Sequence, residues 1–383
     1  MKASITPEVL RWAREKRVRL QIDSASKKLK VKPDQLESWE AGTDRPTFAQ
    51  LKKAANVYKT HVSVFYLPEP PGNFEALTDH RNLPKLHAPN PEQSYRLNAN
   101  IIEAYERREV FIEFYQLLEE PPPEVTLELS ENDTPGHAAE EVANFLHFNT
   151  RALQACTDSR SALKFWRHIV GEFGILVCQT SVNTHLSVEL ETVRGFCIAQ
   201  KPLPVIVVNP KDSPYGRIFT IVHELVHIGL GKSIMQNTNF EAEKEWNRTE
   251  AFCNQVAAEV LVPTDELTSK VNFRTIKPDI SQLSNHFRVS PEVIMRRLLT
   301  LEHISRQEYQ EFRKSQKEKY KDISKTGGPI PYHVKLLNVA GEHFARTAFT
   351  AYYQQKITLA DLAASFSKCD PKHIPKIESV IFT

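Results

Sequence analysis

The residues best suited to chemistry form the pattern His223-Glu224-Leu225-Val226-His227. Its flanks are apolar and free of Pro, so the stretch 219–231 is expected to be a helix. Helical positions i and i+4 share a face, which lets both imidazoles reach one cation, while Glu224 can reach a metal-bound water. Two core histidines beside a solvated Glu is the alternative. The apolar surroundings favour a metal, because buried polar groups without a partner are costly.

A third ligand is expected from a second helix that begins at Glu250, twenty-three residues after His227, and ends near Pro263. A carboxylate from this helix would complete a His2Glu site with one open position, the arrangement of catalytic zinc sites. Glu259 is the rival ligand, on nearly the opposite side of the helix. The alternative role for Glu250 is that of a solvated carboxylate at a helix start, where acidic residues are favoured.

These two motifs resemble the ImmA/IrrE family of metallopeptidases, whose second motif runs roughly E-x-x-A-N-x-F-A-x-x-L-L-x-P. The chain has E-A-F-C-N-Q-V-A-A-E-V-L-V-P, so Cys253 replaces the usual Ala and Val256 the usual Phe. The resemblance covers about residues 135 to 265. It implies that His223, His227 and Glu250 bind metal and that Glu224 is the general base. It also implies that the substrates are transcriptional repressors, cleaved to switch on stress or mobile-element genes.

The expected cofactor is Zn²⁺, or another divalent cation such as Mn²⁺, because such an ion lowers the pKa of its bound water. Three short apolar runs, 174–179, 194–199 and 204–209, are expected to form a small sheet before the motif helix. An extended substrate can add to the edge of such a sheet. Residues 196–199 are a candidate for the exposed edge and 205–209 for the buried core, and the sequence alone does not assign these roles.

Composition indicates a globular protein of two or three domains: 383 residues with 41% hydrophobic content and a formal net charge of +2. The five cysteines are scattered, which predicts reduced thiols and a cytoplasmic location. The first twenty residues carry six Lys/Arg and no apolar core, and no apolar run approaches the length of a membrane span. No membrane partner is expected.

The N-terminal region resembles the XRE family of helix-turn-helix domains. Four short helices are expected between residues 5 and 70, and the stretch 36–47 carries W-E-x-G-x-x-x-P. Residues 1–70 hold 14 Lys/Arg and 8 Asp/Glu, a local net charge of +6 that suits DNA phosphates. The candidate DNA contacts are Gln35 and Ser38 for bases, and Lys27, Lys28 and Lys32 for phosphates.

The expected recognition helix is nevertheless acidic, since it contains Asp34, Glu37 and Glu40. A protein-interaction module that recognises a homologous repressor is therefore the alternative to a DNA reader. A second pair of helices, at 280–301, also invites a DNA interpretation through Arg296 and Arg297. A packing element beside the peptidase part is the preferred interpretation.

The expected fold class is α+β, in five parts: an all-α helix-turn-helix domain (1–70), a linker and long connecting helix (71–133), a zincin-like metallopeptidase domain with a small sheet (134–265), a helix-turn-helix-like region (266–325) and a small helical tail (326–383). Two functions are open. One is a regulatory metallopeptidase that cleaves a repressor or an antitoxin-like protein. The other is a DNA-binding transcriptional regulator whose metallopeptidase-like domain is a sensor that never cuts. The intact His223, Glu224, His227 and Glu250 favour the first.

Overall fold

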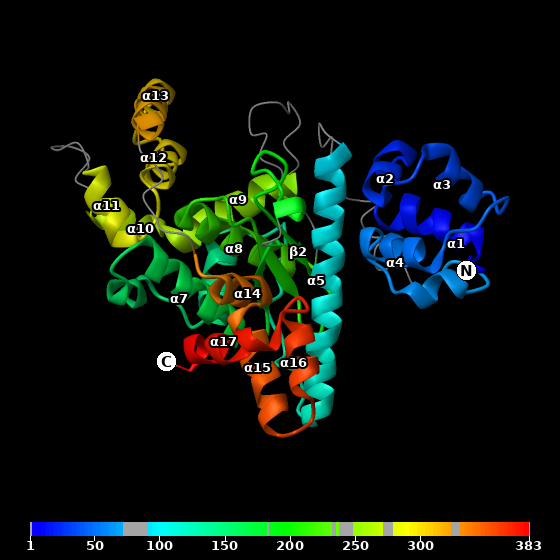
Figure 1. Cartoon of the computed structure of the whole chain (residues 1–383). Coiled ribbons are helices and arrows are strands. Elements are labelled where there is room, and N and C mark those ends of the chain that lie inside the picture. The colour runs from blue at the N-terminus through cyan, green and yellow to red at the C-terminus, as the bar shows by residue number, and fades with distance from the viewer. Residues whose placement is uncertain are drawn as a thin grey trace. The chain divides into compact units, whose positions relative to one another are not determined.

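The computed structural model describes residues 2–71, 91–181, 184–231, 235–236, 248–270, 279–322 and 330–382. The chain forms two compact units (Figure 1). The first comprises residues 1–106 and 181–193, and the second comprises 107–180 and 194–383. The finer five-part division stays a prediction, and residues 72–90 of its linker lie outside the described ranges.

The N-terminal unit begins with short helices around one apolar core. Their bounds are α1 Pro7–Trp12, the π-helical turn η1 Ala13–Arg17, α2 Ile22–Leu29, α3 Pro33–Glu40, α4 Phe48–Val57 and the 3-10 helix η2 Val62–Tyr66. Local signals set these limits: Pro33 opens α3, and Thr47 caps α4 in a reciprocal capping box with Gln50. Trp39 and Tyr58 are fully buried between the helices. The predicted run of short helices is confirmed, whereas the XRE type of arrangement stays a prediction.

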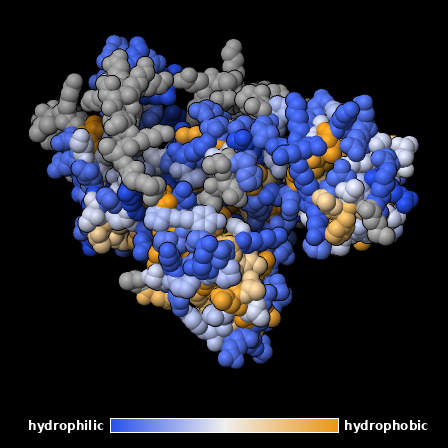
Figure 2. All heavy atoms as spheres, in the orientation of Figure 1, coloured by the Kyte–Doolittle hydropathy of each residue, from blue (hydrophilic) through white to orange (hydrophobic). Residues whose placement is uncertain are grey.

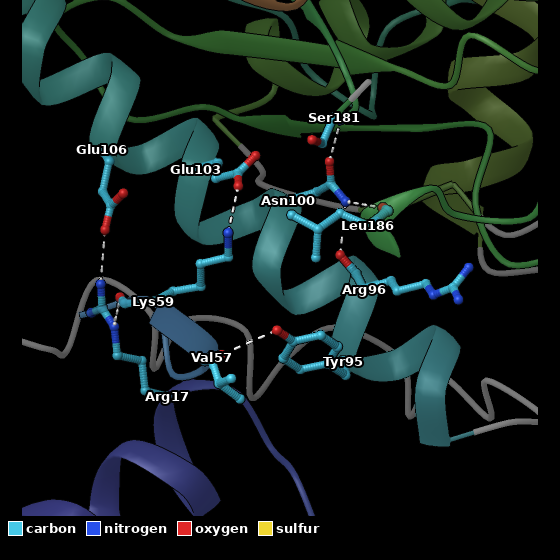
Figure 3. A network of polar contacts seen from close by, with 10 residues as sticks. All are labelled: Arg17, Val57, Lys59, Tyr95, Arg96, Asn100, Glu103, Glu106, Ser181 and Leu186. Atoms are coloured by element: carbon cyan, nitrogen blue, oxygen red, sulfur yellow. Dashed lines mark hydrogen bonds and ion pairs between the residues drawn. The ribbon is translucent and has the colours of Figure 1, made fainter. Parts of the chain in front are cut away.

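The first half of the long helix α5 (Pro91–Leu118) belongs to the N-terminal unit. Ion pairs connect this half of α5 to the N-terminal helical region. In addition, the hydroxyl of Tyr95 donates a hydrogen bond to the carbonyl of Val57 (Figure 3). The ion pairs are Lys28–Glu92 at 2.9 Å, Lys59–Glu103 at 2.8 Å and Arg17–Glu106 at 3.0 Å. Tyr95, Ala99 and Ile102 of this half of α5 are buried in the same core as the short N-terminal helices.

The described part of segment 181–193 lies against the same half of α5, although the chain on either side of it forms strands of the other unit. Asn100 makes two hydrogen bonds with this segment (Figure 3). Its side-chain amide donates to the Leu186 carbonyl at 3.0 Å, and its side-chain oxygen accepts from the Ser181 backbone N–H at 2.6 Å. Leu186, in the 3-10 helix η6 (Thr184–Leu186), is fully buried in the core of the N-terminal unit. The segment is thus an integral part of that unit.

Replacement of Asn100 by Ala is expected to release this segment. It removes the hydrogen bonds that Asn100 makes to the buried Ser181 N–H and to the Leu186 carbonyl, at a cost of about 1–3 kcal/mol for each. Urea unfolding and amide hydrogen exchange measure the loss, and the Ser181 amide should lose its protection. The matched control is Asn98→Ala, because the side chain of Asn98 is partly exposed on the same helix and lacks a hydrogen bond to other described side chains or backbone groups. Equal protection of Ser181 in both variants would contradict this role for Asn100.

The second unit is built on a four-stranded mixed sheet of order β1-β3-β2-β4. Its strands are β1 Leu176–Gln179, β2 Gly195–Ile198, β3 Val205–Val208 and β4 Met235–Gln236. β3 pairs parallel to β1 and antiparallel to β2, and β2 also pairs with β4. The predicted strands are present. The candidate exposed edge at 196–199 is wrong, because β2 lies inside the sheet and its four residues are buried. The two-residue β4 occupies that edge instead.

Helices pack on this sheet and on one another. They are α6 Pro135–Phe145, η5 Thr150–Ala155, α7 Ser159–Glu172, α8 Pro214–Gly229 and α9 Arg248–Leu261. α8 lies between the sheet, α7 and α9. Its approach to β2 is close, because a Cβ at Gly195 would overlap the Thr220 side chain and the Val207 carbonyl. Gly195 therefore lets the motif helix sit directly on the sheet.

Four helices follow Pro263: α10 Thr264–Lys270, α11 Ile280–Phe287, α12 Pro291–Thr300 and α13 Arg306–Asp322. Phe287, Ile294 and Leu298 are buried in the same core as α8 and α9. Arg297 is 5% exposed and donates to the Val262 carbonyl at 3.0 Å. Arg297 is therefore a packing residue, as preferred from the sequence.

The C-terminal helices cover the outer strand of the sheet. They are α14 Tyr332–Ala340, α15 Glu342–Tyr353, α16 Leu359–Ser365, the 3-10 helix η7 Pro371–His373 and α17 Ile374–Ile381. Gly341, at φ +93°, joins α14 to α15 where a Cβ would overlap the Val177 carbonyl. The second half of α5 lies beside them, with the Tyr115 hydroxyl 2.9 Å from His343 Nε2 (Figure 1). The tail thus protects a strand edge that would otherwise be open.

Hydrophilic side chains cover most of the described surface in Figure 2, with hydrophobic ones in separate patches. Among the described residues, no helix combines the length and the apolar character needed to cross a membrane.

Candidate metal centre

The helix α8 carries two histidines into the core. Ser213 caps its start by accepting a hydrogen bond from the Gly216 N–H at 3.0 Å, and Pro214 opens its first turn. Every residue from Thr220 to Gly229 is buried. His223 and His227 are both fully buried and, one turn apart, present their Nε2 atoms to each other at 3.0 Å.

Helix α9 brings Glu250 to these two histidines. One carboxylate oxygen of Glu250 lies 3.4 Å from His223 Nε2, and the other lies 3.2 Å from His227 Nε2. A tetrahedral ion with bonds of about 2.0–2.1 Å needs donor atoms about 3.3 Å apart. The donor set and its spacing therefore fit a zinc-like divalent cation. Within the described ranges, this is the group of His, Cys, Asp or Glu residues that can hold a metal ion.

The rival carboxylate, Glu259, is engaged elsewhere. Its oxygens accept from the Thr264 backbone N–H at 2.7 Å and the Thr264 hydroxyl at 2.9 Å, and it forms an ion pair with Arg297. Glu259 therefore anchors the end of α9 to α12. Glu250 is the carboxylate that faces the histidines.

Glu224 is fully buried beside the three candidate ligands. Burial raises the pKa of its carboxyl well above the usual range, the negative charge of Glu250 raises it further, and the Cys197 thiol opposes the shift. Neither carboxylate oxygen meets hydrogen-bond geometry with a described residue. A buried carboxylate in this state can hold or release a proton according to the charge placed next to it.

The pKa of Glu250 shifts in the opposite direction. Burial alone would raise its pKa, but hydrogen bonds and charge interactions with His223 and His227 hold the pKa of Glu250 below its ordinary value. Glu250 is therefore anionic at neutral pH, as a metal-binding carboxylate must be. The pKa values of the two carboxylates shift in opposite directions because Glu250 interacts with the two imidazoles, whereas Glu224 is fully buried beside the negative charge of Glu250.

Two cysteines near the site were missed as functional candidates. Cys253 is fully buried on α9, with its Sγ 3.5 Å from His227 Nδ1. Cys197 of β2 is near enough to Glu224 to affect its pKa. The spacing of Cys253, three residues after Glu250 and on the same helical face, is the signal that could have found it. For Cys197 the sequence offers none, because the contact depends on how β2 lies against α8.

The candidate DNA contacts in the N-terminal unit differ in their exposure and in their bonding partners. Lys27 and Lys32 are exposed, and Gln35 is partly exposed. The Ser38 hydroxyl donates to the Gln35 carbonyl at 2.7 Å. Lys28 pairs with Glu92 at 2.9 Å and lies over the ring of Tyr95, so it is already engaged.

Helix α3 exposes fewer negative charges than its sequence contains. Glu40 is buried, and both of its oxygens accept from the Arg14 guanidinium at 2.7 Å. This internal pair neutralises one of the three acidic residues and leaves Asp34 and Glu37 exposed. The full acidic charge expected for the helix is therefore an overestimate.

Residues 170–299 match the model of a peptidase family, Peptidase_M78, described as the IrrE N-terminal-like domain. This part of the chain is therefore metallopeptidase-like. The match begins in α7, later than residue 135, and continues past Pro263 through α12. All but the last two residues of the helix pair at 280–301, interpreted above as a packing element, thus lie within the matched region. No curated protein matches the chain.

Loss of a candidate ligand is expected to abolish tight metal binding. His223→Ala or Glu250→Ala should weaken the affinity for Zn²⁺ by more than the ~10–100-fold that follows loss of a residue that only orients a ligand. Elemental analysis and chelator competition measure this, with circular dichroism to verify the fold. Glu259→Gln is the comparison, because this carboxylate faces Arg297 and not the histidines. Metal loss from Glu259→Gln together with full occupancy in Glu250→Ala would show that the ligand assignment is wrong.

Proposed function

We propose that the protein is a regulatory metal-dependent endopeptidase that uses Zn²⁺, or another divalent ion such as Mn²⁺, bound by His223, His227 and Glu250. The observation that carries the proposal is the convergence of these three donors beside the buried carboxylate of Glu224. A bound ion would supply Lewis acidity and a water of lowered pKa.

In this proposal the chain's own residues divide the remaining work. Glu250 and the two imidazoles hold the ion and leave one position open for water or a peptide carbonyl. Glu224 is the general base that takes a proton from the attacking water and later gives it to the leaving amine. The raised pKa of Glu224 suits a group that must carry a proton between these steps.

The proposed substrate is a protein, either a transcriptional repressor or an antitoxin-like protein whose cleavage controls stress or mobile-element genes. The family match over residues 170–299 supports a peptidase, and the N-terminal helices supply a separate module for steering it. We further propose a cytoplasmic location, since all five cysteines are free thiols.

Glu224→Gln tests whether the protein cuts. The substitution keeps the shape of the side chain and removes the base, so metal content and fold should survive while proteolysis falls by at least ~10²-fold. The assay is mass spectrometry of fragments from repressors encoded near the gene, co-expressed with wild type or variant. The regulatory response should be lost with cleavage. A normal response with an uncut repressor would instead favour the non-cleaving sensor.

We propose that the N-terminal unit is an XRE-type domain that contacts DNA through the region around α2 and α3. Two features support this proposal: the local charge of +6, and the internal neutralisation of Glu40 by Arg14. Lys27 and Lys32 are exposed in this region and can meet phosphates. Binding of a homologous repressor by the same surface is the alternative outcome.

The salt dependence of binding separates these outcomes. Binding of the full chain to its own promoter DNA should weaken steeply as salt rises, and Lys27→Ala or Lys32→Ala should each lower the slope of log K against log salt by about 1. Fluorescence anisotropy over a salt series measures the slope. The control is Lys164→Ala, which removes an exposed lysine from the other unit. Absence of salt-dependent binding would indicate a protein-interaction module.

A further inference from the structure

We propose that Cys253 is a positioning residue whose sulfur accepts the Nδ1–H of His227 and so holds that ring with its Nε2 toward Glu250. The inference rests on the proposed metal site. It adds a role for a residue at which the chain departs from the ImmA/IrrE motif.

The placement of Cys253 follows from helix α9. Glu250 and Cys253 are three residues apart, so they share one face of the helix. Glu250 meets the Nε2 side of His227 at 3.2 Å, and Cys253 Sγ meets the Nδ1 side at 3.5 Å. A single helix therefore contacts both nitrogens of one imidazole. The distance suits an N–H···S hydrogen bond, which is longer than one to oxygen because sulfur is the larger atom.

The position of the proton on a neutral imidazole explains why this contact matters for metal binding. Metal binding through Nε2 requires that nitrogen to be unprotonated, so the proton must reside on Nδ1. Metal-binding histidines almost always donate this second N–H to an acceptor, which fixes both the tautomer and the ring orientation. Carboxylates, carbonyls and waters are the usual acceptors. At Nδ1 of His227, the Cys253 sulfur lies within hydrogen-bonding distance.

His223 provides an internal contrast. Its Nδ1 is buried and has no hydrogen-bond partner among the residues that the structure describes. The ring of Phe219 lies beside it, with centroids 6.3 Å apart and planes inclined by 30°. His223 is thus oriented by packing, and His227 by packing together with the contact to Cys253. A change at Cys253 should therefore affect His227 and leave His223 in place.

A purely structural role for Cys253 makes a different prediction. The side chain is fully buried in the apolar core around α8 and α9, where a small apolar residue would also fit. If Cys253 only filled space, Ala would be tolerated better than Ser, because a buried hydroxyl is costly. If Cys253 accepts the Nδ1–H, Ser should be better than Ala for metal binding, because its oxygen is also an acceptor. The rank order of the two variants therefore separates the roles.

The experiment compares full-length wild type, Cys253→Ala and Cys253→Ser by chelator competition with Zn²⁺. Cys253→Ala should bind Zn²⁺ about 10–100-fold more weakly, the usual effect of removing a group that orients a ligand. Cys253→Ser should recover part of the loss, even if urea unfolding of the metal-free protein ranks Ser below Ala. Cys156→Ala and Cys156→Ser are the matched controls, since Cys156 is a buried thiol of the same core. Both controls should keep wild-type affinity.

A second measurement follows the proton on His227 Nδ1. In zinc-loaded wild type, nitrogen NMR of labelled histidines should show His227 with a slowly exchanging proton on Nδ1, and in Cys253→Ala that proton should exchange rapidly. An unchanged Zn²⁺ affinity in Cys253→Ala, or affinities that rank Ser below Ala, would overturn the proposal.

The failures of the two proposals are distinguishable because cleavage is not measured. If wild type binds no Zn²⁺ or Mn²⁺, the metal site and the role of Cys253 fall together. If wild type binds Zn²⁺ through His223 but the Cys253 variants match it, only the role of Cys253 is overturned. A metal-binding protein that cleaves no substrate would leave the inference about Cys253 standing on its affinity and NMR results.

Discussion

The burial of ionisable groups between α8 and α9 is the constraint on which the second unit depends. His223, Glu224 and His227 are fully buried, and such groups are costly in an apolar core unless they have partners. Glu250 provides a negative charge to the two imidazoles, and the cluster then suits a cation at its centre. The two helices must therefore keep a fixed spacing, since a shift of one turn would separate Glu250 from the imidazoles that now lie 3.2 and 3.4 Å from its oxygens.

The rest of the unit holds that spacing. Gly195 lets α8 rest directly on β2, and the Glu259–Arg297 pair ties the end of α9 to α12. The C-terminal helices close the β1 edge of the sheet through Gly341. Helices far apart in the sequence thus support a site formed by two short stretches. The family match, which continues past Pro263 to residue 299, includes both Glu259 and Arg297.

The N-terminal unit also buries polar and charged groups, and it pairs them with other residues. Arg14 neutralises Glu40 inside the core, and Asn100 satisfies the backbone of a segment inserted from elsewhere in the chain. A buried guanidinium and a buried amide both stabilise when every polar atom is paired and cost stability when one is removed. These interactions specify which segments belong together in this unit.

The sequence by itself determined the local features. Helical periodicity placed His223 and His227 on one face with Glu224 beside them, and turn and cap residues such as Pro33 and Thr47 set helix limits. These signals act over three or four residues, so they can be read without knowledge of the fold. Only the tertiary structure decided between Glu250 and Glu259, because both lie on α9 and the choice depends on which side of that helix faces α8. It also placed β2 inside the sheet, buried Glu40 against Arg14, assigned segment 181–193 to the N-terminal unit and brought Cys253 to His227. Each of these depends on contacts between segments distant in sequence, and their energies come from burial and pairing that no local pattern encodes.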